Sequence, residues 1–204
     1  MSTPKSTEQF AILGLLGAID RDGNTSQRSI ARELDVALGL VNAYIKRCAK
    51  KGYIKVRQVP AHRYAYYLTP QGLAEKSRLT AEFLAYSLSY FRDARLSCAL
   101  ALDTATAERG WKSIALVGAG ELAEIAMLCA YEKGIAVKAV VDPIWAGEKF
   151  VGAPLVRGAA DVALSVDGFL VTAMKDQQAV YDELSGTYGA GRIAAPAILG
   201  VVLP

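Results

Sequence analysis

A glycine-rich turn in the second half of the chain has the residue types and spacing to hold a phosphate group. Residues 114–117 predict a buried strand, and Gly118, Gly120 and Ala123 follow it as a GxGxxA pattern that opens a helix. Gly118 allows a tight turn, Gly120 lets a phosphate approach the backbone, and Ala123 permits close packing of the helix on the strand. The amide groups at the start of this helix would face the phosphate.

An acidic residue stands where this pattern usually places a partner for ribose. Residues 137–141 predict a second strand, and Asp142 follows it, 24 residues after Gly118. A carboxylate at this point accepts hydrogen bonds from ribose hydroxyls and would repel a 2′-phosphate, so we expect NAD(H) or another nucleotide as ligand. The alternative is a fold of this kind whose site is vestigial and binds no nucleotide. The expected nucleotide-binding residues are Gly118, Ala119, Gly120, Glu121, Leu122, Asp142 and Pro143.

The same half of the chain lacks a spacing of side chains that suits catalysis. It has no histidine, its only cysteine, Cys129, falls inside the expected helix, and no YxxxK pair links its tyrosines and lysines. The chain's three cysteines form no CxxC pair, which argues against a disulfide framework and a zinc site. We therefore expect no catalytic residue and no bound metal.

Charge separates the two halves of the chain. Residues 1–78 carry 13 Lys and Arg side chains against 6 Asp and Glu, a net charge of +7, whereas residues 111–204 have a net charge of −3. This contrast predicts two domains with different partners, and it predicts that the partner of the first is a polyanion. A basic face that is merely solvated is the alternative.

Two short helices joined by a tight turn are predicted in the basic half. Thr25 or Ser26 can cap the first, and the second runs from about residue 38 to residue 51 and ends at Gly52. Two short helices in this order predict a helix-turn-helix, whose second helix enters the major groove of DNA. Helical spacing predicts that the inward-facing residues are Ile30, Ala31, Leu34, Val41, Tyr44, Ile45 and Cys48.

A wing is expected after the second helix. Residues 53–59 and 63–68 predict two strands that turn around residues 60–62 and place Arg57, His62 and Arg63 near phosphates or the minor groove. For His62, the only histidine, an exposed loop residue is the alternative. The expected DNA-binding residues are Ser26, Gln27, Arg28, Gly39, Asn42, Lys46, Arg47, Arg57, His62 and Arg63.

Residues 70–108 contain no strong helix breaker and predict one long helix or two in series. Apolar residues recur along it at steps close to those of a coiled coil, which predicts a homodimer interface, since helix-turn-helix proteins generally bind DNA as twofold dimers. A helix that lies along its own domain is the alternative. Residues 96–107 are expected to pack against the second domain. The apolar stripe consists of Leu73, Leu79, Phe83, Tyr86, Tyr90 and Ala94.

Strands that alternate with helices after residue 110 predict a parallel sheet covered on both faces. The expected fold class is α/β with an α+β N-terminal part. We expect a winged helix-turn-helix DNA-binding domain over residues 1–69, a linking and dimerisation helix over residues 70–109, and a nucleotide-sensing domain over residues 110–204.

One part of the chain resembles the MarR-type winged-helix regulators, and most of all the subgroup found with exopolysaccharide gene clusters. It spans about residues 8–95 and includes TSQRSIARELDVALGLVNAYIKRCAKKGYIK and YAYYLTPQGLAEKSRLTAEFL. The resemblance implies a DNA-binding regulator. The chain departs from the family at Ala37, Leu38 and Gly39, where a Ser or Thr cap that can also touch a phosphate is usual.

Residues 96–202 resemble the Rossmann domain of the NADH-sensing Rex repressors and the first part of nucleotide-sugar enzymes. The resemblance rests on WKSIALVGAGELAEIA, an Asp-Pro after the second strand, GEKFVGAPLV and AAPAILGV. It implies a Rossmann-like domain that binds NAD(H) or a nucleotide-sugar. The chain departs from Rex in a short sheet half after Thr172 and in ending at Pro204 without the helix that Rex subunits exchange. Dimerisation is then expected from residues 70–108.

These features together predict a ligand-responsive transcriptional regulator, a repressor that binds double-stranded DNA and senses a nucleotide. No apolar run is long enough for a membrane helix and residues 1–10 lack an apolar signal region, so we expect a cytoplasmic protein. One alternative is a small nucleotide- or nucleotide-sugar-dependent enzyme with a winged-helix docking module, which would turn over a nucleotide substrate. Another is an architectural DNA-binding protein with no response to small molecules.

Overall fold

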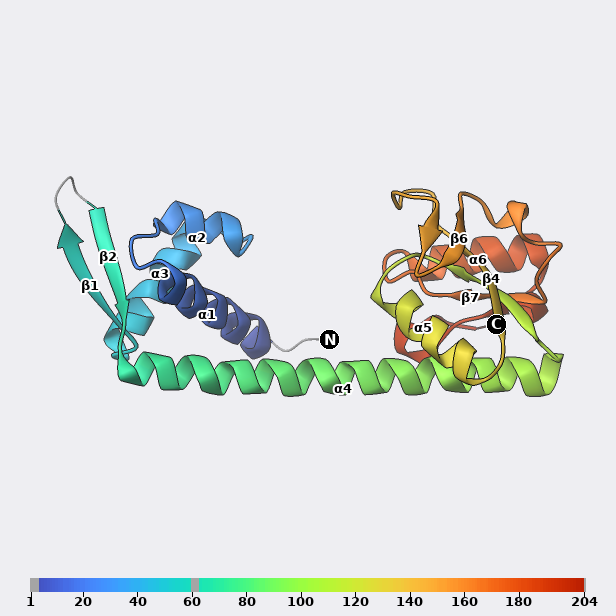
Figure 1. Cartoon of the computed structure of the whole chain (residues 1–204), viewed down its shortest axis with the longest axis horizontal. Helices are drawn as coiled ribbons and strands as arrows, with labels where there is room; N and C mark the ends of the chain where they lie inside the picture. The colour runs from blue at the N-terminus through green and yellow to red at the C-terminus, as the bar shows by residue number, and fades with distance from the viewer. Residues whose placement is uncertain (1–3, 60–62, 204) are drawn as a thin grey trace. The chain divides into compact units, whose positions relative to one another are not determined.

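The computed structural model describes residues 4–59 and 63–203, which belong to two compact units, Met1–Ser87 and Leu88–Pro204. We call them unit 1 and unit 2 and describe each by itself. Helix α4 (Pro70–Arg109) contributes its residues up to Ser87 to unit 1 and the remainder to unit 2 (Figure 1). Within the described residues, no helix combines the length and the apolar character needed to cross a membrane.

Unit 1 is a three-helix arrangement followed by a two-stranded hairpin and the first part of α4. Its earlier elements are α1 (Pro4–Arg21), α2 (Gln27–Glu33), α3 (Leu38–Lys50), β1 (Ile54–Val59) and β2 (Arg63–Leu68). One core joins them, in which Leu15 and Leu16 of α1 pack with Ile30 of α2 and Val41 and Ile45 of α3. The inward faces of both short helices are therefore those that helical spacing predicts.

Local side-chain chemistry sets where these helices begin and end. The Ser26 hydroxyl accepts a hydrogen bond from the Ser29 backbone N–H at 3.1 Å and caps α2. Gly52 follows α3 with φ of 75°, a conformation that glycine adopts without strain. The Thr69 hydroxyl accepts from the Gly72 N–H at 3.0 Å and donates to the Gly52 carbonyl at 2.6 Å, which ties the start of α4 to the end of α3.

The hairpin of unit 1 has a regular antiparallel register. Ile54 pairs with Leu68, and Val59 pairs with Arg63. The backbone N–H of Tyr66 also donates to the Gly23 carbonyl at 2.7 Å, so the loop before α2 is hydrogen-bonded to β2. The strands form as expected, except that the first begins at Ile54 and not at residue 53. The turn at residues 60–62 lies outside the described residues.

Unit 2 is a six-stranded sheet covered by helices. Its elements after α4 are β3 (Ser113–Val117), α5 (Glu121–Glu132), β4 (Ala136–Val141), β5 (Lys149–Phe150), β6 (Ala153–Val156), β7 (Gly168–Val171), α6 (Gln177–Tyr188) and β8 (Ile193–Ala194), with 3₁₀ turns at Ala159–Asp161, Ala190–Arg192 and Ala197–Leu199. The strand order is β5-β6-β4-β3-β7-β8, and all neighbours are parallel except the antiparallel pair β5 and β6. The order reverses at β3, and doubly wound sheets bind their ligands at the carboxyl ends of the strands beside such a point.

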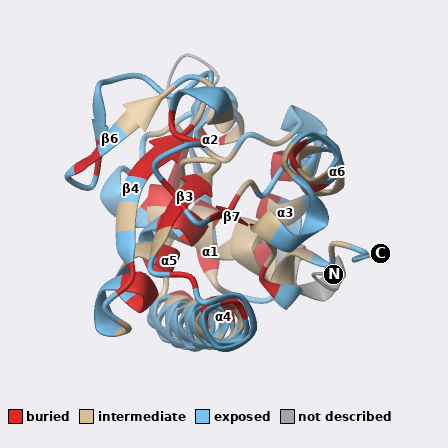
Figure 2. Cartoon of the chain, turned by 90° about the vertical axis from the view of Figure 1, so that its right-hand side faces the viewer, coloured by how far each residue is buried: buried red, intermediate tan, exposed pale blue. Residues whose placement is uncertain are grey.

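Alternate residues of β3 face opposite sides of this sheet. Ile114 and Leu116 join the core under α4 and α5, whereas Ala115 joins the core under α6. Figure 2 shows buried residues concentrated on β3, β4 and β7. A strand that is apolar on both faces reads as a continuous apolar run, which is why residues 114–117 could be predicted as buried.

Helix α4 forms as one helix, but it is not a separate unit. Leu79 is buried in the core of unit 1, and Ala94 is buried in the core of unit 2. The expected division into residues 1–69, 70–109 and 110–204 thus differs from the two compact units. The expectation that residues 96–107 pack against the second domain holds for one side of the helix: Cys98 and Leu102 are buried, whereas Leu100 is exposed.

Candidate nucleic-acid interface and nucleotide site

Helix α3 buries one side and exposes the side that a recognition helix would present to DNA. Val41, Ile45 and Cys48 lie in the core of unit 1, while Gly39 and Lys46 are exposed. The side chains that face outward are therefore those that the helical pattern predicts, with Asn42 at the edge and partly buried. Burial on one side fixes the rotation of α3 about its axis.

The two ends of α3 differ in chemistry. Its N-cap is Ala37, which forms no side-chain capping bond, and Leu38 and Leu40 of the first turn are 43% and 47% exposed. Its C-terminal part is basic, with Lys46, Arg47, Lys50 and Lys51 lining one shallow surface hollow. A polyanion is attracted to the basic end, whereas the first turn offers apolar contacts.

Some residues expected at DNA also have partners within the protein. Arg47 forms an ion pair with Glu8 of α1, a surface interaction worth at most about 1 kcal/mol and easily exchanged for a phosphate. The Gln27 amide donates to the Tyr66 hydroxyl at 3.1 Å, and Ser26 caps α2. Two of the predicted contacts are thus used to hold α2 in place, a role that the sequence alone did not indicate for Gln27.

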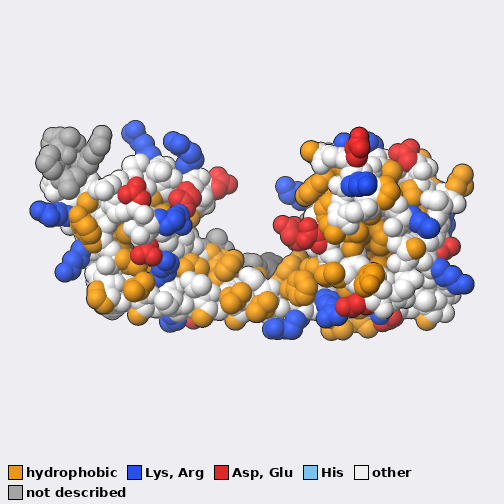
Figure 3. Space-filling view, viewed as in Figure 1, with side chains coloured by type: hydrophobic (Ala, Val, Ile, Leu, Met, Phe, Trp, Pro, Cys, Tyr) orange, Lys and Arg blue, Asp and Glu red, His pale blue; other side chains and the backbone are white. Residues whose placement is uncertain are grey.

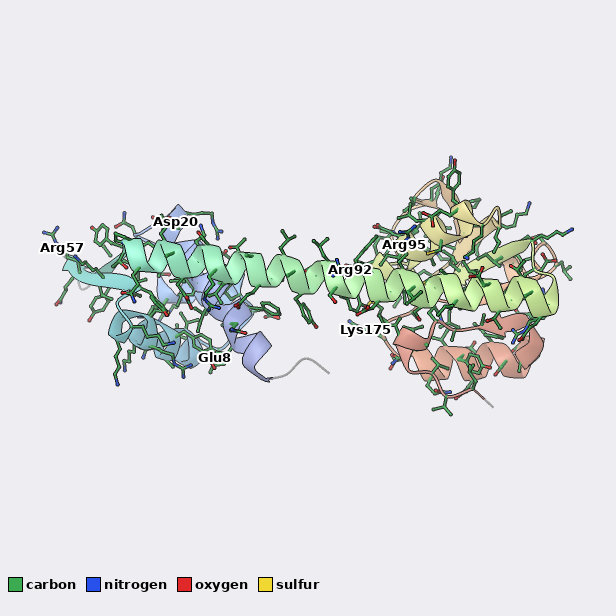
Figure 4. The ribbon with its side chains drawn as sticks, turned by 90° about the horizontal axis from the view of Figure 1, so that it is seen from below. Glu8, Asp20, Arg57, Arg92, Arg95 and Lys175 are labelled. Carbon is green, nitrogen blue, oxygen red and sulfur yellow. The ribbon has the colours of Figure 1, made fainter. Side chains whose placement is uncertain are left out.

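The wing carries exposed basic side chains on one face. Lys55 and Arg57 are two residues apart on β1, so they project to the same side of the hairpin, and Tyr67 lies opposite Lys55. Figure 4 shows Arg57 extending from the hairpin away from the rest of unit 1, and Figure 3 shows Lys and Arg side chains on the surface of this unit with Asp and Glu side chains among them. Arg28 on α2 is exposed as well. His62 lies outside the described residues, and for Arg63 the structure describes only the backbone at the start of β2.

The glycine turn of unit 2 has the close contacts that its first glycine predicts. Gly118 has φ of 106°, and a Cβ atom there would lie 2.5 Å from the Cα of Ala173. Its N–H donates to the Val141 carbonyl at 2.9 Å, and the buried Thr172 hydroxyl donates to the Gly118 carbonyl at 2.6 Å. Any side chain at this position would push β7 away from β3.

The second glycine leaves the start of α5 open. Gly120 is the N-cap of α5 with φ of 148°, and a Cβ atom there would meet nothing within 4 Å. No side chain caps the helix, so its first N–H groups are available to an anion. Ala123 is fully buried and packs α5 on the sheet as expected.

Asp142 is bonded to the glycine turn itself. One carboxylate oxygen accepts from the Ala119 N–H at 2.9 Å, and the other accepts from the N–H groups of Ile144 and Trp145 at 2.9 and 2.8 Å. Partial burial alone raises the pKa of Asp142, but these three donors and the charge of Arg157 outweigh it and hold the pKa below its usual range. The carboxylate is therefore ionised at neutral pH.

This geometry refines the roles that the sequence predicts at the turn. The Ala119 N–H is directed at Asp142, so in this conformation it does not point at a phosphate. Leu122 is buried in the core, which leaves only its backbone for a ligand, whereas Glu121 and Pro143 are exposed. Arg157 donates to the Trp145 carbonyl at 2.6 Å and so fixes the loop after Asp142. The contacts of Arg157 and Thr172 have no signal in the sequence pattern.

A cavity of about 450 Å³ in unit 2 does not include the glycine turn. Its lining consists of residues of α4, Tyr181 of α6 and the segment after α6. Gly118, Gly120 and Asp142 are not among the lining residues. In the part of the chain that the structure describes, no cluster of three His, Cys, Asp or Glu side chains could hold a metal ion.

The cysteines are buried. Cys129 of α5 packs against α4, where its thiol donates to the Arg95 carbonyl at 3.5 Å. Burial raises the pKa of the Cys129 thiol, and it raises the pKa of Cys48 to about 11 and that of Cys98 to about 12. A core role for Cys129, as its place in the helix predicts, agrees with this burial.

The apolar stripe of α4 is partly used within unit 1. Leu79 belongs to the core, and the rings of Phe83 and Tyr86 lie 5.1 and 5.8 Å from the ring of Phe10 on α1. Leu79 is therefore not available to a partner subunit, contrary to the expected interface. Phe83 and Tyr86 still expose nearly half of their surface.

Comparison with known proteins supports the character of unit 1. Residues 11–55 match the family model described as winged helix-turn-helix DNA-binding. The chain therefore carries a winged helix-turn-helix of the DNA-binding kind, followed by a long helix and a sheet domain of α/β type. No curated protein matches the sequence.

Three solved structures resemble parts of the chain. The PcaV transcriptional regulator from Streptomyces coelicolor has 16% identity over 45% of this chain and 62% of its own, with a TM-score of 0.38. MepR, a transcription regulator of the Staphylococcus aureus multidrug efflux pump MepA, has 25% identity over 41% and 61%, with a TM-score of 0.35. A structure described as PigF with SAH has 15% identity over 94% and 56%, with a TM-score of 0.26. The chain spans about three fifths of the length of these proteins.

Proposed function

We propose that this protein is a ligand-responsive transcriptional regulator, a cytoplasmic homodimeric repressor that binds double-stranded DNA through unit 1 and a nucleotide through unit 2. The proposal of DNA binding rests on the exposed side of α3. This helix is the second helix of a helix-turn-helix, and its C-terminal turn is basic. The net charge of +7 over residues 1–78 supports the same partner.

DNA binding is tested by its dependence on salt and on three side chains. Contacts to several phosphates per subunit should give the dimer a log–log slope of affinity against salt that is more negative than about −4. Replacing Arg57 or Arg63 by Ala should weaken all duplexes alike, because both would contact the backbone or minor groove. Replacing Asn42 by Ala should reduce the preference for a selected duplex over random DNA. A mobility-shift series in which none of these replacements alters binding would contradict the placement of α3 in the groove.

The nucleotide part of the proposal rests on the open N-terminus of α5 and on Asp142. The space above Gly120 admits a phosphate, and the ionised Asp142 carboxylate can accept from ribose hydroxyls. A 2′-phosphate would meet that negative charge, so NAD or NADH should bind better than NADP or NADPH. These residues fit a Rossmann-like site for a nucleotide, and NAD(H) or a nucleotide-sugar is the proposed effector.

Titration of the purified protein with NADH, NAD, ATP and UDP-sugars tests this site. Gly120→Val should abolish binding, because the new side chain fills the space that the phosphate needs. Gly152→Val is the matched control, since Gly152 also has a positive φ of 86° and open space around it but lies in the turn between β5 and β6. If no nucleotide binds more tightly than about millimolar, a free energy of about 4 kcal/mol, the effector proposal is wrong.

We propose no catalytic step for this chain. Cys129 is buried with a raised thiol pKa, and Tyr188 packs on Phe169 with ring centroids 5.0 Å apart, so neither is presented to a ligand at the glycine turn. Turnover of any of the titrated nucleotides by the purified protein would contradict this part of the proposal and favour an enzyme.

A further inference from the structure

The outward side of the first two turns of α3 is almost free of polar side chains. Leu38, Gly39 and Leu40 form the first turn, and Asn42 and Ala43 continue it. Ala37 caps the helix without a side-chain hydrogen bond, Gly39 has nothing near its Cα that a side chain would touch, and both leucines are close to half exposed. Asn42 is thus the only residue of this set that can hydrogen-bond through its side chain.

The position of these residues on the helix matters. In a helix-turn-helix the N-terminal residues of the second helix contact base edges, while basic residues elsewhere hold phosphates. The basic side chains of α3 begin at Lys46 and continue to Lys50. The base-contacting part of α3 therefore offers methyl groups and one amide, with no cation to donate to guanine O6 and N7.

Base pairs differ in what they offer such a surface. Thymine alone among the four bases presents a methyl group in the major groove, and apolar side chains recognise it by contact. Adenine presents an acceptor and a donor that match the amide of an asparagine. Guanine is read most often by Arg or Lys, which the first two turns of α3 lack.

We propose that α3 reads an A·T-rich half-site, in which Leu38 and Leu40 contact thymine methyl groups and Asn42 pairs with adenine. This inference rests on the proposed binding to DNA and adds the kind of sequence that is bound. The adjoining basic turn, with Lys46 and Lys50, complements a polyanion and makes DNA the occupant of this surface in preference to an apolar protein partner.

The experiment removes the methyl groups from the DNA and leaves the protein unchanged. Duplexes of about 24 base pairs, long enough for two half-sites one helical turn apart, are selected from a random pool with the full chain. Each thymine of the selected duplex is then replaced in turn by deoxyuridine, which lacks only the methyl group. Wild-type protein should lose about fourfold in affinity at one or two positions per half-site, the equivalent of about 0.8 kcal/mol for one buried methyl group.

Protein variants assign the effect to α3. Leu38→Ala and Leu40→Ala should each lose the thymine preference at one of the sensitive positions. At that position the variant should bind the thymine duplex and the deoxyuridine duplex with equal affinity. Leu128→Ala is the matched control, because Leu128 is an exposed leucine of α5 that belongs to neither candidate site, and it should keep the full thymine preference. All three leucines are exposed, so their replacement by Ala should leave the fold intact.

The outcomes separate the inference from the function on which it rests. Salt-dependent binding with equal affinity for thymine and deoxyuridine at every position would overturn the inference and leave DNA binding standing. Selection of G·C-rich duplexes would overturn it in the same way. Failure of the full chain to enrich or bind any duplex would instead overturn the proposed function, and the inference with it.

Discussion

Replacing Asp142 by alanine should destabilise unit 2 and loosen the glycine turn. The carboxylate accepts hydrogen bonds from three backbone N–H groups. A hydrogen bond to a charged group contributes about 1.5–3 kcal/mol to stability when it is shielded from water. The Ala119 N–H is partly buried and would lose its acceptor, whereas the exposed residues Ile144 and Trp145 can turn to water at a cost of about 0.5 kcal/mol each. The expected loss is therefore about 2.5–4 kcal/mol.

This loss converts to a change in the unfolding midpoint. Unit 2 comprises the 117 residues from Leu88 to Pro204, and an unfolding entropy of about 2.1 cal/mol/K per residue gives about 0.25 kcal/mol per degree. The midpoint of unit 2 should then fall by about 10–16 °C. Both tryptophans of the chain, Trp111 and Trp145, belong to unit 2, so tryptophan fluorescence during heating follows this unit alone.

The effect of Asp142 also depends on pH with a definite sign. Its pKa is lower in the folded protein than the unperturbed value near 3.9, so the stabilisation is complete above about pH 5 and is lost as the pH falls through the folded pKa. The difference in midpoint between the wild type and Asp142→Ala should thus be full at neutral pH and shrink in acid. Asp167 also has a lowered pKa, because it accepts hydrogen bonds from Lys112 and Ser113, but it contributes equally to both proteins and cancels in the difference.

Asp182→Ala serves as the control for the loss of a carboxylate. The Asp182 carboxylate is exposed and, within the described residues, accepts only from the Gln178 side chain on the same helix, so its removal should shift the midpoint by no more than about 2 °C. If Asp142→Ala behaves like this control at neutral pH, the carboxylate does not hold the turn. A midpoint difference that stays constant from neutral pH into acid would refute the assignment to an ionised Asp142.

Three further outcomes follow from the packing. Phe83→Glu should split the proposed homodimer in sedimentation, because a large exposed apolar side chain of α4 contributes about 1.5–3 kcal/mol when buried; an unchanged dimer mass would place the interface elsewhere. Gly168→Ala should lower the midpoint followed by tryptophan fluorescence, since its Cβ atom would lie 2.1 Å from the ring of Trp111; an unchanged midpoint would mean that this ring moves freely. Cys98 should react with a thiol reagent only after unfolding, because burial raises its pKa to about 12; rapid reaction of the native protein would contradict that burial.

The elements around both candidate sites could be predicted because their signals are local. Ser26 caps α2 through a residue three positions away, and Gly52 ends α3 through its own backbone conformation. The strand, glycine turn, helix and second strand from residue 113 to residue 141 depend on apolar periodicity and on the positions of three glycines. None of these features needs knowledge of a distant part of the chain.

The interactions that sequence reasoning missed join residues that are far apart. Gln27 bonds to Tyr66 across unit 1, Thr172 bonds to Gly118 across two strands, and Arg157 bonds to the loop after Asp142. Each pairing depends on the register of the sheet or hairpin, which no spacing along the chain reveals. The face of α4 posed a similar problem, because Leu79 fits the stripe of a dimer helix as well as it fits the core of unit 1.

Control of DNA binding by a nucleotide requires more than the presence of two sites. A nucleotide changes the affinity for DNA only by the ratio of its own affinities for the DNA-bound and free protein, and DNA must change the nucleotide affinity by the same factor. The Ala119 N–H donates a hydrogen bond to the Asp142 carboxylate. A ribose that binds the same carboxylate would compete with this hydrogen bond and so change the conformation of the glycine turn. A nucleotide that binds free and DNA-bound protein equally well would leave DNA affinity unchanged, however tightly it binds. Measuring both dissociation constants, each with and without the other ligand, therefore decides whether unit 2 regulates unit 1.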